Sequence, residues 1–317
     1  MHKGLVKQEN VVHMSEHEGQ VRGLVKYAPG PIVMTVDLED WFQVENARSA
    51  YPVATWDSCD LRVILYTKIL LDIFDYYNIH CTFFVLGWLA ERCKSIVRDI
   101  QARGHEVASH GYGHQLTYEL SGEKLREDLY RSKSLLEDIT GTRVLGYRAP
   151  SFSITKRVLE RLRELGYVYD SSYNNTAANK RYGKIEGQWH ESSAGHLMAR
   201  NGIFELPVSN LSIDRITLPW GGGGYFRFWP FPLFMWGVKR ILSTKGSYLF
   251  YFHPWELDSV QPKIRNIGIA KRFRHRVNLG NTFHRINLLC STFNYCRFIS
   301  CASFLEAPPR CALPAKL

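Results

Sequence analysis

The chain has 317 residues, of which 45% are hydrophobic and 22% charged. This is the composition of an ordinary globular protein, and it excludes a wholly disordered chain, a collagen and a coiled coil. Lys and Arg (40) outnumber Asp and Glu (30), an excess that favours anionic partners. Residues 271–317 hold eight Lys or Arg and one acid. We therefore expect a C-terminal basic extension (residues 259–317) on a nearly neutral body, with peripheral contact to a membrane or an anionic glycan and without nucleic-acid binding.

The cysteine pattern and the N-terminus bear on the cellular compartment. Seven cysteines are scattered along the chain without a CxxC pair, which disfavours a disulfide framework and a zinc knuckle. Residues 1–29 are polar and lack the apolar region of a secretory signal, so we expect a loose leader there. The chain has no run of 18 apolar residues, and a transmembrane helix is not expected. Together these features predict a cytoplasmic protein.

Predicted strands and helices alternate along the chain. Apolar runs predict strands, and 3.6-residue periodicity predicts helices. In chain order we expect a strand at 31–36, a helix at 60–77, a strand at 81–86, a helix at 88–103, a strand at 105–109, a helix at 122–140, a strand at 143–147, a helix at 153–164, and strands at 167–169, 203–208 and 247–252. Fully apolar strands that alternate with helices indicate a parallel sheet covered on both faces. Six or seven such units suggest an α/β barrel.

Polar residues follow the predicted strands at their C-terminal ends. The residues in these positions are Asp37, His110, Arg148, Asp170 and His253. In a parallel barrel the C-terminal strand ends meet at one rim, where active sites are built. We therefore expect these side chains to lie close together.

Two groups of residues have the chemistry of metal ligands. His110 and His114 are separated by three residues, and on one helical turn both imidazoles would point the same way. Asp37, Glu39 and Asp40 place three carboxylates directly after a buried strand. The histidine pair could arise by chance, and the acids could form a solvated loop or a helix cap. A bound cation would instead relieve the repulsion between buried acids, and two histidines with one carboxylate leave open positions for water and substrate.

Other residues suit substrate handling. Arg148 could orient a carboxylate, and His253 could act as a general acid, although either could be structural. Trp220 and Tyr225 flank a Gly-rich loop and could stack on sugars, or could belong to the core or an interface. We also assign Asp170 and Pro150 to the predicted substrate-binding set.

Five motifs in this order resemble the polysaccharide deacetylase family (NodB homology, carbohydrate esterase family 4). They are Thr35-Val-Asp-Leu-Glu-Asp40, Ser109-His-Gly-Tyr-Gly-His114, Arg148-Ala-Pro-Ser151, Asp170-Ser-Ser172 and Phe252-His-Pro-Trp255. Further segments, including Pro219-Trp-Gly-Gly-Gly-Gly-Tyr-Phe-Arg227, resemble a subgroup linked to exopolysaccharide synthesis and exosortase systems. The resemblance implies a distorted (β/α)7-type barrel, which we place at residues 30–258.

The resemblance also implies roles for individual residues. By this similarity Asp37 is the catalytic base, Arg148 its partner and His253 the general acid, while His110 and His114 bind a divalent metal, most often zinc. The family usually has a second acid adjacent to the base, but this chain has Leu38 there. The carboxylate ligand is therefore Glu39 or Asp40, and we favour Glu39.

These residues predict a metal-dependent hydrolase that removes N-acetyl groups from N-acetylhexosamine units of a polysaccharide or its precursor. One alternative is an allantoinase-like amidohydrolase that acts on a small amide. Another is a catalytically silent barrel that binds glycans. Retention of Asp37, both metal-ligand histidines and His253 disfavours the silent alternative, because an inactive protein would be free to lose them.

Overall fold

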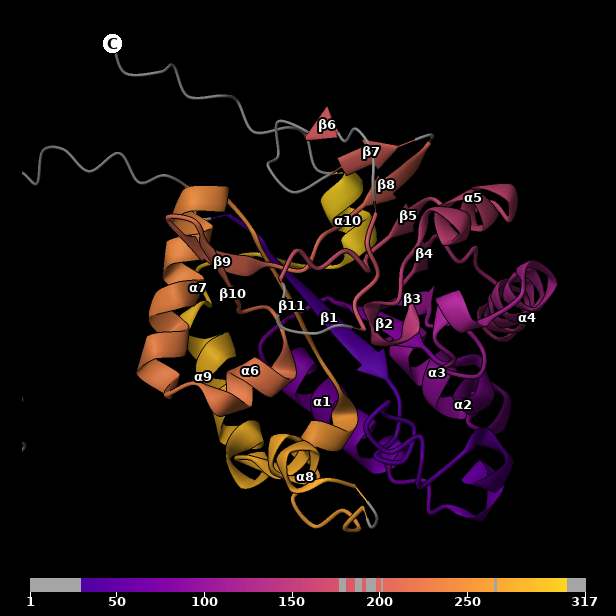
Figure 1. The fold of residues 1–317 in the computed structure, drawn as a ribbon. Coiled ribbons are helices and arrows are strands. Elements are labelled where there is room, and N and C mark those ends of the chain that lie inside the picture. The colour runs from indigo at the N-terminus through magenta and orange to yellow at the C-terminus, as the bar shows by residue number, and fades with distance from the viewer. Residues whose placement is uncertain are drawn as a thin grey trace, which may run out of the picture.

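The computed structural model describes residues 30–176, 181–185, 190–191, 198–200, 202–264 and 267–306. The predicted leader, residues 1–29, and the last part of the predicted extension, residues 307–317, lie outside this range. The described chain is an α/β protein built on one large sheet (Figure 1). In spatial order its strands are β11 (Tyr248–Phe252), β1 (Ile32–Leu38), β2 (Thr82–Val85), β3 (Glu106–Ser109), β4 (Gly146–Tyr147), β5 (Tyr169–Asp170), β8 (Ile203–Glu205), β7 (Met198–Arg200) and β6 (His190–Glu191).

The sheet curls into a distorted barrel. Strands β11, β1, β2, β3, β4, β5 and β8 are parallel, whereas β6 and β7 are antiparallel additions at one edge. The gap between β8 and β11 is crossed by irregular chain. The Ser209 N–H donates to the Leu249 carbonyl at 3.3 Å, and the Tyr251 N–H donates to the Gly221 carbonyl at 2.8 Å. The predicted seven-stranded, distorted α/β barrel is therefore confirmed.

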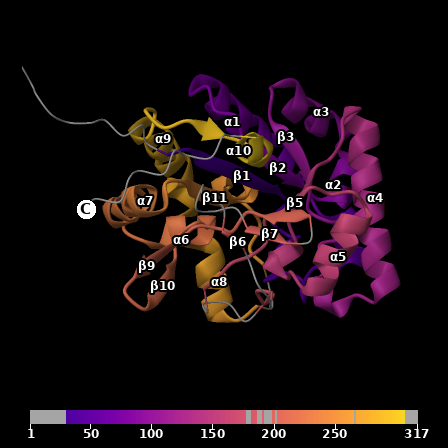
Figure 2. The same cartoon turned by 90° about the horizontal axis from the view of Figure 1, so that it is seen from above.

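Helices surround the strands (Figures 1 and 2). One group, α1 to α5, flanks β1 to β5, and α6, α7 and α9 lie beside β11 on the other side. The helices are α1 (Val63–Tyr76), α2 (Gly87–Arg92), α3 (Lys94–Ala102), α4 (Gly122–Thr140), α5 (Lys156–Glu164), α6 (Gly223–Phe228), α7 (Phe231–Lys245), α8 (Ile269–Arg276), α9 (Thr282–Thr292) and α10 (Cys301–Glu306). A hairpin of β9 (Asn210–Ile213) and β10 (Ile216–Pro219) packs on α7.

Five short 3-10 helices complete the described elements. They are η1 (Val53–Ser58), η2 (Thr117–Glu119), η3 (Pro150–Phe152), η4 (Pro254–Leu257) and η5 (Leu279–Asn281). None of the helices in the described part of the chain is both long and apolar enough to cross a bilayer.

Three predicted helices differ in their bounds from the observed ones, and one of them, expected at 60–77, spans Val63–Tyr76. The segment 88–103 is divided at Cys93, whose backbone (φ −124°, ψ 47°) is not helical. The helix predicted at 153–164 begins at Lys156, because the Thr155 side chain accepts a hydrogen bond from the Val158 N–H and caps it. The helix predicted at 122–140 has the observed bounds of α4, with Ser121 as its N-cap and Gly141 in the left-handed conformation at its C-terminal end.

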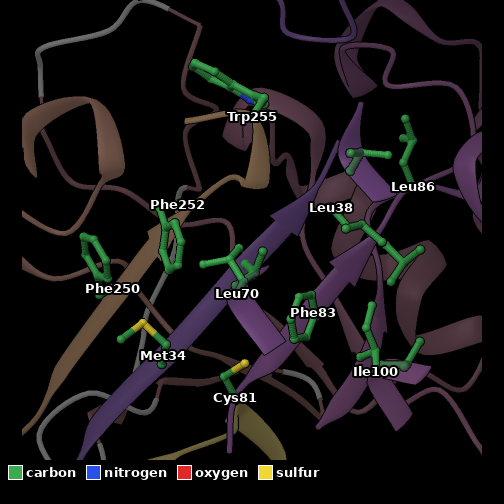
Figure 3. Packing of buried hydrophobic residues seen from close by; sticks show 14 of the residues in the cluster. Met34, Leu38, Leu70, Cys81, Phe83, Leu86, Ile100, Phe250, Phe252 and Trp255 are labelled. Carbon is green, nitrogen blue, oxygen red and sulfur yellow. The ribbon is translucent and has the colours of Figure 1, made fainter. Parts of the chain in front are cut away.

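The core lies between the strands and the helices that cover them. Figure 3 shows Met34, Phe83 and Phe250 from three neighbouring strands packing with Leu70 of α1. All seven residues of β1 are buried, as expected of a central strand with both faces covered. Because β1 is held on every side, the residues at its C-terminal end have a defined position.

The C-terminal segment packs onto the barrel. Strand β12 (Phe298–Ile299) pairs in parallel with the start of β1. The Cys301 N–H donates to Thr82 Oγ1 at 2.8 Å, and the Ala302 N–H donates to Glu106 Oε2 at 2.9 Å. Residues of the expected C-terminal extension (259–317) therefore pack onto the barrel that we place at residues 30–258.

We expect Leu70→Ala to lower the free energy of unfolding by about 2–5 kcal/mol, because it leaves a cavity beneath β1. Leu65 lies on the same helix and is 58% exposed, so Leu65→Ala should cost less than about 0.5 kcal/mol. Urea denaturation of both variants checks this difference. Equal losses would contradict the packing described here.

Candidate metal centre and active site

Two acids lie at the C-terminal end of β1. Asp37 is the sixth residue of the strand and pairs with Phe84 of β2, while Glu39 follows the strand and donates its N–H to the Asp37 carbonyl at 3.0 Å. Asp37 is 2% exposed and Glu39 3%. Buried carboxylates are costly unless they are paired or bind a metal. The partners of these two acids therefore indicate what the site does.

His110 and His114 follow the end of β3. The prediction that they share a helical turn is wrong, because residues 110–114 form a loop in which Gly111 (φ 73°) and His114 (φ 49°) adopt left-handed conformations. His110 Nδ1 lies 2.8 Å from the Arg148 carbonyl. An Nδ1–H that donates to this carbonyl leaves Nε2 as the atom available to a ligand.

Glu39, His110 and His114 form a buried three-ligand cluster. One donor atom from each lies within 4.8 Å of the others, and within the described ranges of the chain no other group of three His, Cys, Asp or Glu side chains does so. The Glu39 Oε2 atom is 2.7 Å from His114 Nε2 without the geometry of a hydrogen bond, and it has no hydrogen-bond partner. An unpartnered buried oxygen beside two imidazoles fits a divalent cation, and this donor set suits zinc.

The protonation states of Glu39 and His110 also suit a cation. Burial opposes ionisation of Glu39, but His114, His253 and His110 outweigh it and lower the Glu39 pKa to about 2. Burial lowers the His110 pKa to about 4, so this imidazole is neutral at pH 7. A carboxylate and a neutral imidazole are the forms that bind metal ions.

Arg148 holds Asp37 from the opposite side. The guanidinium is fully buried and donates from Nη1 to Asp37 Oδ1 at 2.6 Å. It also donates to Thr35 Oγ1, to the Ser171 carbonyl and to Ser171 Oγ, each at 2.8 Å. These bonds fix the arginine, which in turn orients the Asp37 carboxylate.

His253 follows β11 and completes the site. Its Nε2 atom lies 3.3 Å from Glu39 Oε1 and 3.9 Å from Asp37 Oδ2. Its Nδ1 atom lies 3.2 Å from Glu256 Oε2, and Glu256 Oε1 accepts a hydrogen bond from Arg227 Nε at 2.9 Å. Burial would lower the His253 pKa, but the charges of Glu39, Glu256 and Asp37 raise it to about 9. At neutral pH His253 therefore carries a proton in the metal-free protein.

A cavity opens onto these side chains. The Trp255 ring, on the η4 turn after β11, stacks on His253 at a centroid distance of 5.3 Å and on His275 of α8 at 4.5 Å. The wall of the cavity includes Asp37, Glu39, His110, His114 and His253. Further wall residues include Glu45, Phe152, Arg181, Tyr182, Tyr251 and Arg274.

Asp40 lies outside the metal cluster, so the structure favours Glu39 as the carboxylate ligand. Asp40 Oδ2 accepts the backbone N–H groups of Arg62 and Val63 at the start of α1, at 2.7 and 2.9 Å, and Oδ1 accepts that of Trp41. Burial raises the Asp40 pKa to about 6, against the effect of these hydrogen bonds. Its role is to hold the start of α1.

The four residues predicted to bind substrate do not line the cavity. Trp220 is 1% exposed and stacks between Trp229 and Phe234, which makes it a core residue. Asp170 is fully buried and accepts hydrogen bonds from Ser172. Pro150 is buried beside the cavity residue Ser151. Tyr225 touches the site indirectly, since its hydroxyl accepts a hydrogen bond from the cavity residue Arg274 at 3.2 Å.

Sequence reasoning missed Glu256 and Arg227. Glu256 had a detectable signal, because it lies three residues after His253, the spacing of a capping box. The sequence gives no signal that Arg227 contacts Glu256, because the two residues are brought together only when α6 packs beside η4 in the fold.

Comparisons with known proteins divide the chain in two. Residues 47–169 match the model of the polysaccharide deacetylase family, and residues 171–303 match a domain of unknown function (DUF3473). The first region is therefore similar to the polysaccharide deacetylase family. This region carries His110, His114 and Arg148, whereas the second carries His253, Glu256 and Arg227.

Similar proteins include known deacetylases. A peptidoglycan deacetylase of Helicobacter pylori is 29% identical over 150 residues, which is 47% of this chain and 50% of that protein. A peptidoglycan-N-acetylglucosamine deacetylase of Bacillus cereus is 30% identical over 102 residues, 32% of this chain and 47% of that protein. The chain thus spans about half the length of these curated relatives.

A solved structure shares the fold of this chain. It is a protein of Mycobacterium smegmatis assigned to polysaccharide deacetylases, with a TM-score of 0.57 and 19% sequence identity. The match covers 92% of this chain and 98% of that one. The two regions of this chain therefore correspond together to one previously observed fold.

We expect the protein to bind one equivalent of Zn²⁺ and the His114→Ala variant to bind it at least about tenfold more weakly, because one of three protein ligands is lost. Isothermal titration calorimetry after chelator treatment measures this. His284→Ala on the exposed surface of α9 is the control and should bind like the parent. Unchanged affinity in His114→Ala would argue against the cluster as the metal site.

Proposed function

We propose that this protein is a metal-dependent hydrolase that removes N-acetyl groups from N-acetylhexosamine units of a glycan. The observation that carries the proposal is a cluster of three ligands, Glu39, His110 and His114, that lies beside two further groups. One is the Asp37 carboxylate, which Arg148 holds and which is positioned as a general base. The other is the His253 imidazole, which Glu256 holds and which is positioned as a general acid. The family of residues 47–169 and the relatives described above support this reaction class.

A divalent ion bound to the three ligands, most suitably Zn²⁺, would supply Lewis acidity toward the acetyl carbonyl and water. Asp37 would take the proton of the attacking water, with Arg148 holding Oδ1 and leaving Oδ2 on the side of His253. His253 in its protonated form would give its Nε2 proton to the departing amine. Glu256 would keep the imidazole in this orientation through Nδ1. Acetate and a free amine are the products.

We further propose that the substrate is a polymer or a lipid-linked precursor, of the kind used for exopolysaccharide. The relatives named above act on peptidoglycan, and this supports an N-acetylated glycan in general. A substrate panel of N-acetylglucosamine oligomers, peptidoglycan fragments and allantoin would separate these glycans from a small cyclic amide. Acetate release from the glycans alone is expected.

We expect Asp37→Asn to reduce acetate release by at least about 10²-fold, because the amide cannot accept the proton of water. Circular dichroism and zinc titration of the same variant check that the fold and the metal cluster remain. Acetate release at the parent rate from a folded, zinc-loaded Asp37→Asn variant would refute the assigned base.

We expect Glu256→Gln to lower kcat about tenfold or more with little change in KM, because Glu256 orients His253 rather than contacting substrate. The expected loss is smaller in Glu256→Asp, which keeps the charge at a shorter reach. Steady-state kinetics on a soluble N-acetylglucosamine oligomer separate kcat from KM. A rise in KM alone would instead place Glu256 in substrate binding.

A further inference from the structure

Helix α8 carries large apolar side chains on the surface beside the cavity. Ile269 is 84% exposed and Phe273 is 60% exposed. The two residues are four positions apart and therefore lie on one face of the helix. The opposite face is anchored, because His275 is buried, stacks on Trp255 and lies 2.8 Å from Gln261 Oε1 through Nε2. The apolar pair is thus held outward by a fixed helix.

The same helix is strongly basic. Lys271, Arg272 and Arg274 are exposed, and they alternate with the apolar pair along the helix. We call Ile269, Lys271, Arg272, Phe273 and Arg274 the α8 surface.

No acid neutralises this charge in the neighbouring sequence. Residues 215–255 and 259–305 contain no Asp or Glu. The two acids between these segments, Glu256 and Asp258, are buried and paired with Arg227 and Arg62. The elements that contact α8 are α6 and, through Trp255, the η4 turn, whose one acid, Glu256, is buried and paired with Arg227.

We propose that the α8 surface docks the protein on an anionic lipid bilayer. Ile269 and Phe273 enter the boundary between headgroups and acyl chains, while Lys271, Arg272 and Arg274 contact lipid phosphates. Large apolar side chains on one face of a helix and Lys and Arg on its other faces are typical of interfacial membrane helices. Each base near an anionic surface adds to the attraction.

Other occupants fit this surface less well. A second copy of the chain would bring two acid-free basic surfaces together, and these repel. An acidic glycan would match the charge, and Phe273 could stack on a sugar ring, but a glycan gives no reason to expose the aliphatic Ile269. The bilayer accounts for both kinds of side chain.

Docking at α8 would bring the cavity close to the membrane surface. Arg274 and His275 of α8 are themselves part of the cavity wall. Figure 1 shows α8 at the margin of the molecule, next to α6. A glycan linked to a membrane lipid would thus be delivered near the cavity opening. Membrane binding itself does not depend on the proposed reaction.

The test is co-sedimentation of the full chain with vesicles of phosphatidylcholine alone or mixed with phosphatidylglycerol. We expect binding to the mixed vesicles only, and weaker binding at high salt. The variant Ile269→Ser/Phe273→Ser should bind the mixed vesicles at least about tenfold more weakly, because the inserting groups are lost. Lys271→Glu/Arg272→Glu should lose binding through charge reversal.

Matched controls come from other helices. Tyr76 (81% exposed) and Leu65 (58% exposed) on α1 resemble Ile269 and Phe273 in exposure, so Leu65→Ser/Tyr76→Ser should bind like the parent. Lys124→Glu/Arg126→Glu on α4 makes the same change of charge at exposed positions. It should weaken binding less than the α8 reversal. Thermal unfolding of every variant checks that it folds.

Two results would overturn the proposal. The first is equal binding to both kinds of vesicle, and the second is parental binding by Ile269→Ser/Phe273→Ser. The second result, together with displacement from mixed vesicles by a soluble acidic polysaccharide, would assign the surface to anionic glycan. Acetate release plays no part in this assay, so a failure of the proposed reaction would leave its outcome unaffected.

Discussion

The site depends on the compensation of buried negative charge at the end of β1. Asp37 and Glu39 lie where solvent hardly reaches, so each needs a positive or polar partner within a few ångströms. Arg148 meets this need for Asp37, and His114 and His253 meet it in part for Glu39. The remaining imbalance is that Glu39 Oε2 accepts no hydrogen bond. Its presence explains why a cation fits here and why the surrounding loops must be held so closely.

That compensation comes from both regions of the chain. The region that matches the polysaccharide deacetylase model supplies His110, His114 and Arg148. The region that matches the domain of unknown function supplies His253 and the two residues that support it, Glu256 and Arg227. Arg227 is fixed in turn by the carbonyl oxygens of His275 and Val277, at 3.1 and 2.6 Å. The second region is thus part of the barrel and of the site. Helix α8 is connected to His253, the proposed general acid, through Arg227 and Glu256.

Much of this arrangement could be predicted from local sequence. Parallel strands have recognisable apolar runs, and the polar residues directly after them, such as Asp37 and His253, lie at the common rim because topology requires it. Short-range cues failed where tertiary contacts decide the structure. His110 and His114 converge through left-handed loop residues rather than a helix. The side chain of Trp220 fills the space beside Gly237, where a Cβ atom would come within 2.2 Å of its ring, and no sequence spacing reveals this.

The pairing of β12 with β1 has a consequence for the order in which the protein is made. Ile32 emerges from the ribosome long before its partner Phe298. Strand β11, on the other side of β1, is also made long after it, whereas β2 follows soon after β1. The strand that carries Asp37 therefore has only β2 as a neighbour until β11 is made, and contacts of such long sequence separation form slowly. A nascent chain would thus hold Glu39, His110 and His114 before His253 and the strand that precedes it exist.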